Sequence, residues 1–169
     1  KLGSPPDFGT LYSGRALEFD GTVDYVTVGN CHTGDYTISA WIKPDSVSDG
    51  TIYSGNGYEM LLRPSSGKLQ MFAGGSGNKE ITDDVCIVVD VWHYVVGTWD
   101  GSNVKLYVNG VLKSSSTTGT LDNPDVGAGM IGRHSTASQN FYNGEISNLQ
   151  VWDKAWSLSD VQYAYTHPE

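Results

Sequence analysis

Apolar and polar residues alternate along short segments of the chain, and this period of two is typical of half-buried β-strands. In segment 36–43 every even-numbered residue is apolar and most odd-numbered residues are polar. Pro44 ends that segment, because proline has no N–H to continue a sheet ladder. Comparable segments, separated by Gly, Asn, Asp and Ser, predict strands at 17–20, 25–28, 36–43, 58–63, 69–73, 92–99, 104–108, 111–115, 129–133 and 141–152.

Segment 92–115 predicts a three-stranded antiparallel meander. Its first two strands are joined by a turn at 100–103, and Asn109-Gly110 matches a type I′ hairpin, in which both central residues need positive φ. Another turn is predicted at 64–67. Gly144 interrupts the last strand and indicates a bulge or a close approach of another backbone.

One helix is predicted at 157–165, where Ser157 and Asp160 have the spacing of a capping box. Leu158, Val161 and Tyr165 share one of its faces. A helix of about two turns is stable only when it docks on other structure. We therefore expect it to pack on a sheet, held there by Trp156 just before it.

Ten or more short strands with one terminal helix predict an all-β fold, a two-sheet antiparallel jelly-roll sandwich with a short C-terminal helix. Residues 14–169 are expected to form a single domain. Residues 1–13, with Pro5-Pro6, are expected to be a lead-in tail or loop. Because the chain starts at Lys1 rather than Met, we expect a processed product or an excised fragment.

The composition narrows the classes of partner. The 169 residues include 19 acidic and 10 basic side chains, and the net charge is −9. This argues against nucleic acid, which binds positive surfaces, and permits bound cations. No apolar run reaches the length of a membrane span, so no membrane insertion is expected. Cys31 and Cys86 could form one disulfide or remain two separate thiols.

Four motifs follow one another between residue 16 and about residue 165: ALEFDG with DYV at 16–26, YTISAWIKP at 36–44, WH with GTWDG and LYVNG at 92–110, and FYNGEI with VW and LS at 141–159. Together they resemble the laminin-G-like jelly-roll domains of the concanavalin A-like lectin/glucanase superfamily. The resemblance implies the sandwich fold. It does not decide the function, because the superfamily includes lectins, carbohydrate-binding modules, cell-adhesion domains, pentraxin-like proteins and glycosidases. Segment 4–14 is also similar to laminin-G-like domains of marine phage structural proteins.

Hydrolysis is not expected. The glucanase branch works with two carboxylates on one strand, and residues on the same face of a strand are two apart. Glu145 is followed by Ser147 and Asn148 where a second acid would stand. The four histidines are far apart in the sequence. We therefore predict a protein that is not an enzyme.

Calcium is a candidate cofactor at Asp20 and Asp24, which flank the first turn. Carboxylates and loop carbonyls are the ligands that calcium takes. The alternative is that Asp20 only stabilises the turn by accepting hydrogen bonds from nearby amides. A second acidic cluster lies at 122–125.

Sugar binding needs an exposed aromatic ring beside amide, acid or guanidinium groups. Two loop regions combine these types, and the candidate carbohydrate-binding residues are Tyr53, Asn56, Tyr58, Arg133, His134, Gln139, Asn140, Phe141 and Tyr142. The alternative is that Tyr53, Tyr58 and Phe141 cover the core. Trp41, Trp99 and Trp152 are assigned to the core or to packing between strands.

The sequence thus predicts a non-catalytic carbohydrate-binding or adhesion module, with calcium as a candidate cofactor. Its partner would be a carbohydrate or a glycosylated surface, and its location extracellular, at a cell surface or at a virion surface. An oligomer is left open. The alternative is a structural or protein-interaction domain, a decoration or spacer without sugar specificity.

Overall fold

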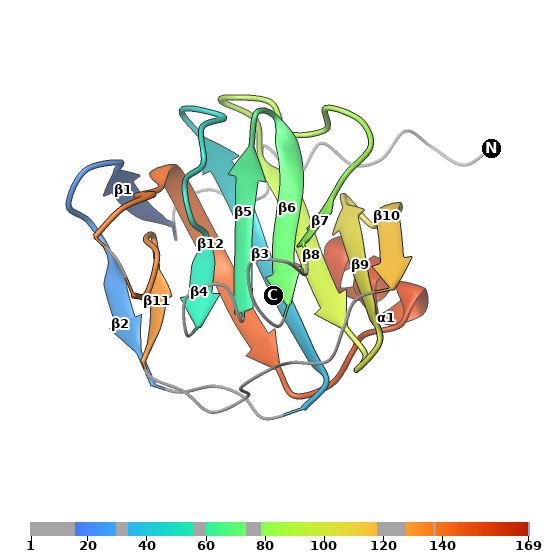
Figure 1. Ribbon diagram of the computed structural model, residues 1–169. Helices are drawn as coiled ribbons and strands as arrows, with labels where there is room; N and C mark the ends of the chain where they lie inside the picture. The colour runs from blue at the N-terminus through green and yellow to red at the C-terminus, as the bar shows by residue number, and fades with distance from the viewer. Residues whose placement is uncertain are drawn as a thin grey trace.

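The computed structural model describes residues 16–29, 34–55, 60–73, 79–117, 128–136 and 138–168. Within these ranges the strands form two antiparallel sheets of six strands each, which lie in two layers (Figure 1). Sheet A has the order β1 (Leu17–Asp20), β12 (Asn143–Trp152), β3 (Tyr36–Pro44), β8 (His93–Trp99), β9 (Asn103–Val108) and β10 (Val111–Thr117). Sheet B has the order β2 (Val26–Val28), β11 (Gly129–Ile131), β4 (Tyr53–Gly55), β5 (Met60–Ser65), β6 (Lys68–Ala73) and β7 (Lys79–Ile81). The predicted jelly-roll sandwich is confirmed.

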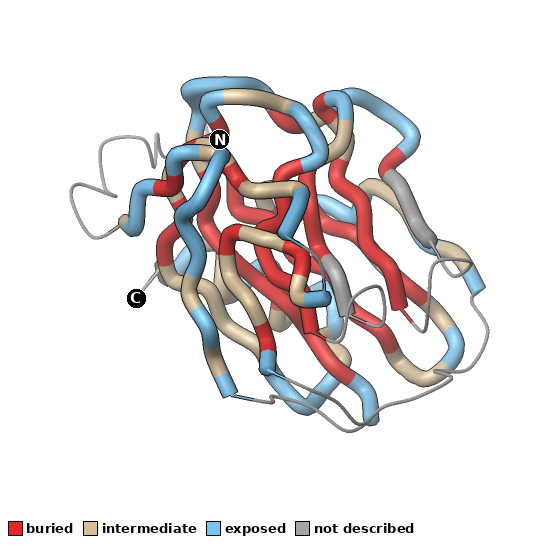
Figure 2. The backbone as a smooth tube through the Cα atoms, turned by 60° about the vertical axis from the view of Figure 1, so that its left-hand side comes forward, coloured by how far each residue is buried: buried red, intermediate tan, exposed pale blue. Residues whose placement is uncertain are grey.

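The main core lies between the two sheets. Side chains from alternate residues of the central strands of both sheets pack together there, as the period of two requires, and exclude water. Ile38, Ile42 and Val95 from sheet A meet Leu62 and Met71 from sheet B in one buried cluster. These strands are red along most of their length in Figure 2, whereas exposed segments gather in the loops and at the edges.

The predicted meander is confirmed as β8, β9 and β10, and Asn109 and Gly110 adopt φ of 51° and 76°. The turn predicted at 64–67 is shorter than expected, because only Ser66 and Gly67 adopt positive φ. Pro64 remains in β5 and pairs with Leu69. It is tolerated there because β4 pairs with β5 only as far as Leu62, so the neighbour on that side has ended.

The three-residue strands β4 and β7 were not expected from the sequence. Cys86 carries a free thiol, which is the second of the two alternatives left open for it, and its Sγ lies 3.4 Å from the hydroxyl of Thr82. Cys31 and segment 1–13 lie outside the described residues. None of the described helices is long and apolar enough to cross a membrane.

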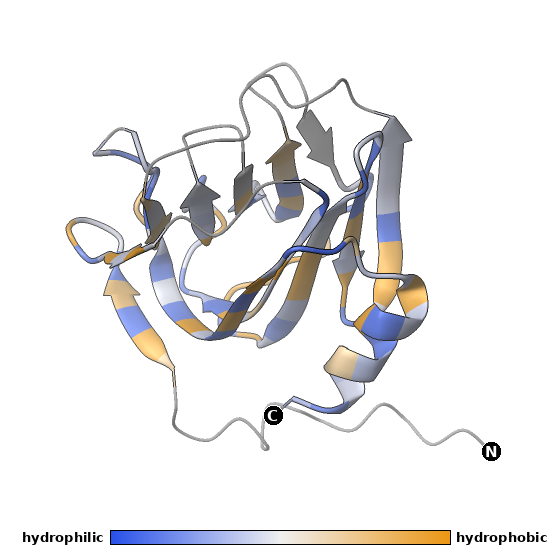
Figure 3. Ribbon diagram, turned by 90° about the horizontal axis from the view of Figure 1, so that it is seen from below, coloured by the Kyte–Doolittle hydropathy of each residue, from blue (hydrophilic) through white to orange (hydrophobic). Residues whose placement is uncertain are grey.

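Helix α1 (Leu158–Thr166) lies against part of the outer face of sheet A (Figure 3). On that face Trp41, Tyr94 and Tyr107 form a second buried cluster. Val161 is the fully buried contact of the helix with this cluster. Tyr165 stacks on Trp41 with ring centroids 5.8 Å apart. The expected docking is confirmed, but Leu158 is exposed and does not share the docked face.

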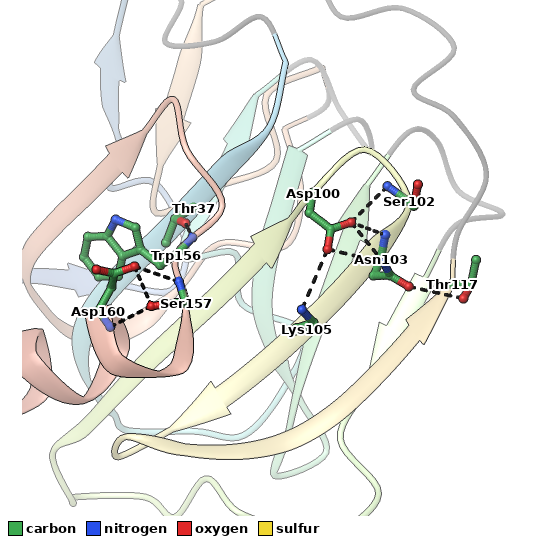
Figure 4. Close-up of polar contacts among 9 residues, drawn as sticks. All are labelled: Thr37, Asp100, Ser102, Asn103, Lys105, Thr117, Trp156, Ser157 and Asp160. Atoms are coloured by element: carbon green, nitrogen blue, oxygen red, sulfur yellow. Dashed lines mark hydrogen bonds and ion pairs between the residues drawn. The ribbon is translucent and has the colours of Figure 1, made fainter.

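The start of α1 is held by local hydrogen bonds, as its sequence predicts. Ser157 accepts from the Asp160 amide, and the Asp160 carboxylate accepts from the Ser157 amide at 2.8 Å (Figure 4). The N–H of Trp156 donates to the hydroxyl of Thr37 at 2.9 Å, which ties the entry of the helix to β3. The helix therefore starts at a fixed position on sheet A.

Strand β12 contains a bulge that reverses the direction of its side chains. Its pairing with β3 shifts between Ser147 and Gln150, and Asn148 adopts a φ of 44°. Ile146 before the bulge and Val151 after it both face the core, although they are five residues apart. An uninterrupted strand would place them on opposite faces. The bulge inserts one extra residue into β12, and this brings both side chains to the same face.

Gly144 in the same strand is a site of close approach rather than the bulge. Its φ is 129°, and a Cβ there would clash with the carbonyl oxygen of Lys43. Of the two alternatives predicted for Gly144, the structure selects the second. From Gly144 to Ser147, β12 pairs with β3 in regular register, up to the point where the bulge begins.

Candidate functional site

A groove of about 410 Å³ lies on the outer face of sheet A, between the end of β12 and helix α1. Strand residues supply one wall and helix residues the other. Its lining residues are Tyr94, Asn148, Gln150, Trp152, Lys154, Trp156, Asp160, Tyr163, Ala164 and His167. We call it the helix groove.

Trp152 forms the strand wall of the helix groove. The bulge turns this side chain outward, and 47% of its surface is exposed, which corrects the assignment of Trp152 to the core or to packing between strands. The ring still contacts Trp156, with centroids 5.6 Å apart. An indole held at one edge and open elsewhere can stack on the apolar face of a ligand.

A chain of side-chain hydrogen bonds fixes the orientation of Trp152. Its indole Nε1–H donates to Gln150 Oε1 at 2.9 Å, and Gln150 Nε2 donates to Asn148 Oδ1 at 2.9 Å. The indole and the two amides therefore lie in a row along the outer face of β12. Amides beside a fixed ring provide both donors and acceptors for hydroxyl groups.

Tyr163 forms part of the helix wall and is 66% exposed. Its ring stacks on the ring of His167 at 4.1 Å, and the Nδ1 of His167 lies 2.9 Å from the Tyr163 carbonyl oxygen. This pair closes the last turn of α1. The wall opposite Trp152 thus carries a second aromatic surface.

The charges in the helix groove are few and opposite in sign. Lys154 Nζ lies 3.6 Å from Asp160 Oδ2. Hydrogen bonds from the Ser157 hydroxyl and amide lower the pKa of Asp160, so its carboxylate is ionised at neutral pH. One ammonium paired with one carboxylate suits a neutral ligand rather than a phosphorylated one.

None of the described residues that line the helix groove was a candidate binding residue from the sequence. The sequence nevertheless contains a pattern from which the groove could have been predicted. The apolar residues Ile146, Leu149 and Val151 change from even to odd positions within one strand. That change of phase predicts a bulge, and a bulge moves Trp152 to the outer face.

Three of the predicted carbohydrate-binding residues are corrected by burial. Tyr53 and Tyr142 are each 1% exposed and His134 is 2% exposed, so none offers a face to a ligand. Tyr142 packs edge-on against Phe19 in the core, and burial raises its pKa. Burial, with a smaller contribution from Arg63, lowers the pKa of His134.

Four of the remaining members of that set, Arg133, Gln139, Asn140 and Phe141, follow β11. The guanidinium of Arg133 lies 4.0 Å from the ring centroid of Tyr25, which is exposed. The carbonyl of Asn140 accepts from Thr51 at 2.8 Å, and that of Gln139 accepts from the His134 amide. We call this region the β11 rim.

Phe141 is half-buried next to the β11 rim. A role for Arg133, Gln139, Asn140 and Phe141 in sugar binding stays a prediction. Two further candidates, Asn56 and Tyr58, lie outside the described residues.

Asp20 and Asp24 form a tight turn. Asp20 Oδ1 accepts from the amides of Thr22, Val23 and Asp24 at 2.8 to 3.2 Å, and Oδ2 accepts from the Thr22 hydroxyl at 2.6 Å. The Thr22 hydroxyl and these amides hold the pKa of Asp20 far below its usual value. Asp24 Oδ2 in turn accepts from the Asp20 amide. Because donors already surround Asp20, this geometry fits the turn-stabilising alternative better than a cation site.

The carboxylate of Glu145, the acid considered for hydrolysis, is engaged by a lysine. Glu145 Oε1 lies 2.9 Å from Lys43 Nζ in a cross-strand ion pair. Within the described ranges, no three His, Cys, Asp or Glu side chains cluster so as to hold a metal ion. The acidic cluster at 122–125 lies outside those ranges.

Comparison with known proteins identifies the family. The sequence model of the family described as the concanavalin A-like lectin/glucanases superfamily matches residues 20–162, so the chain belongs to this superfamily. No curated protein matches the chain in sequence.

Solved structures of several binding proteins share the fold. A heptameric SAP-like pentraxin from Limulus polyphemus aligns with a TM-score of 0.68 and 21% identity, over 88% of this chain and 80% of its own. Domain 4 of the extracellular arabinanase AbnA from Geobacillus stearothermophilus, solved with arabinotriose, aligns with a TM-score of 0.68 and 20% identity, over 90% and 77%. A putative carbohydrate binding protein from Bacteroides ovatus aligns with a TM-score of 0.68 and 22% identity, over 86% and 47%. At these identities the likeness concerns the fold alone.

Proposed function

We propose that this protein is a non-catalytic carbohydrate-binding module that holds a neutral saccharide in the helix groove. The observation that carries the proposal is the half-exposed indole of Trp152, fixed by Gln150 and Asn148 opposite Tyr163. A sugar ring has weakly apolar faces and a fringe of hydroxyls, so stacking and amide hydrogen bonds recognise it together. The paired charges of Lys154 and Asp160 leave the groove close to neutral.

Two of the structural neighbours support this proposal. One is described as a putative carbohydrate binding protein, and the other is an arabinanase domain bound to arabinotriose. The ligands of these neighbours do not transfer at this identity, but the arabinotriose complex suggests neutral oligosaccharides as the first probes. We choose arabino-, xylo-, cello- and chito-oligosaccharides, each from the single sugar to the hexasaccharide, and call them the oligosaccharide set.

The test is a titration of the oligosaccharide set into the wild type and a Trp152→Ala variant, monitored by calorimetry after a glycan array has ranked the ligands. We expect Trp152→Ala to weaken binding at least about tenfold, or ~1.4 kcal/mol. Leu17→Ala, which removes an exposed apolar side chain from β1, is the matched control and should bind as the wild type does. Equal binding by all three proteins would overturn the assignment to the helix groove.

The calcium cofactor and the cellular location are the parts of the proposal with the least structural support. Calcium at Asp20 and Asp24 stays a prediction that the net charge of −9 permits, although the turn-stabilising alternative fits the geometry better. An adhesion role at an extracellular, cell or virion surface also stays a prediction. Bound calcium would make the melting temperature fall by several degrees in EDTA. An unchanged melt, with no metal by elemental analysis, would exclude calcium as a cofactor.

A second candidate function is a protein-interaction or spacer domain. The loop between β7 and β8 exposes four valines, Val85, Val88, Val89 and Val91, which is unusual for a monomer surface. If this loop binds a second copy of the chain, sedimentation velocity will show concentration-dependent association that a Val88→Asp, Val89→Asp variant lacks. A monomeric wild type that binds the oligosaccharide set would favour the first proposal.

A further inference from the structure

A second hollow, of about 460 Å³, lies on the other side of α1. Gln162 and Thr166 line it from the helix, and Asn109, Gly110 and Val111 line it from the β9–β10 turn. We call it the turn hollow. Both cavities adjoin α1, and α1 packs on the outer face of sheet A. The turn hollow and the helix groove therefore lie on the same face of the sandwich.

Tyr163 lines both cavities. Its ring is exposed and is held by the stack on His167, so it forms a fixed divider between them. A helix with its side chains is about 10 Å across. A ligand that touches both cavities must therefore be longer than a single sugar ring.

The turn hollow has the same kind of chemistry as the helix groove. Gln162 supplies an amide, and Val111 supplies an exposed apolar surface. The hydroxyl of Thr166 donates to the carbonyls of Gln162 and Tyr163, and the Asn109 amide oxygen accepts from Tyr94 at 2.9 Å. None of its described lining residues carries a charge. Such a surface suits a neutral chain of hydroxyl-bearing units.

We propose that the helix groove and the turn hollow are two subsites of one extended site, which binds a linear neutral oligosaccharide running across the last turn of α1 over Tyr163. This inference rests on the proposed function. It adds that the ligand is a chain rather than a single terminal sugar. The helix groove holds one part of the chain on Trp152, and the turn hollow holds another on Val111 and Gln162.

The test uses the full chain and the oligosaccharide set. Affinity should rise at least about tenfold between the disaccharide and the longest oligomer of the bound series. A Val111→Ser, Gln162→Ala variant should lose that gain and bind the disaccharide as the wild type does, whereas Trp152→Ala should weaken binding at every length. Leu158→Ala, on the same helix but lining neither cavity, is the control. Circular-dichroism melts will verify that each variant is folded.

The possible failures are distinguishable. If short oligomers bind and depend on Trp152, but affinity is independent of length, the extended site is wrong and the proposed function stands. The same conclusion follows if the Val111→Ser, Gln162→Ala variant behaves as the wild type at all lengths. If no member of the set binds, both proposals fail.

Discussion

The two ends of β12 carry large aromatic side chains in opposite environments. Tyr142, immediately before the strand, is 1% exposed and packs against Phe19. Trp152, its last residue, is about half exposed and lines the helix groove. Residues an even number of positions apart lie on the same face of a regular strand. Tyr142 and Trp152 are ten positions apart, so a regular strand would place both on one face. The bulge at Asn148 is therefore what distinguishes them.

This difference shows why the type of a residue does not reveal its role on a strand. Aromatic residues from two loop regions were among the sequence-based candidates, and the structure buries two of the tyrosines, Tyr53 in β4 and Tyr142 just before β12, in the core. Trp152 was assigned to packing, and the structure leaves it in contact with solvent. The face that a side chain occupies depends on register, and a single bulge changes the register.

The largest expected effect is on the free energy of unfolding, when the aromatic side chain at each end of β12 is replaced by alanine. Tyr142→Ala should lower the free energy of unfolding by about 3–5 kcal/mol, the usual cost of deleting a buried aromatic side chain. Trp152→Ala should lower it by less than about 1 kcal/mol, because the site is on the surface. Urea denaturation of both variants measures this; similar losses at the two positions would contradict the comparison.

The bulge itself can be tested at Asn148. Asn148→Val places a β-branched residue at positive φ, and should destabilise the fold by about 1–2 kcal/mol. Asn148→Gly should keep the bulge and the stability but remove the hydrogen bond to Gln150, so only saccharide binding should weaken. If the glycine variant is the less stable of the two, the role assigned to the positive φ is wrong.

The helix side of the groove depends on the cap of α1. Ser157→Ala should cost about 1 kcal/mol, because the Asp160 amide loses its acceptor. It should also weaken saccharide binding, since Asp160 and Tyr163 lie on the helix that frays. Ser159→Ala, in the same turn but outside the capping box, should change neither the melting temperature nor the affinity.

The smallest effect concerns pH and the core rather than the groove. Burial lowers the pKa of His93 and His134 below the ordinary value of 6.5. The unfolded chain therefore binds protons that the folded chain excludes, so stability is fully present above pH 6.5 and decreases as the pH falls below it. Melting temperatures across this range should show the loss, and His93→Gln should reduce it.

Local sequence patterns were sufficient to predict much of the fold. The meander, the Asn109-Gly110 turn and the Ser157 cap each depend on neighbouring residues, and all three are confirmed. The family resemblance is confirmed as well. The candidate site required long-range information, because Trp152 and Tyr163 line one groove only after α1 docks on sheet A and β12 changes phase.

The most direct test of the helix groove as the binding site is an NMR titration of the five indole N–H signals with the strongest ligand of the oligosaccharide set. We predict that Trp152 and Trp156 shift together with the Tyr163 ring, whereas the buried Trp41 and Trp99 do not. If the groove tryptophans stay unchanged while Arg133 and Tyr25 of the β11 rim respond, the sugar binds at the rim and the assignment to the helix groove is wrong.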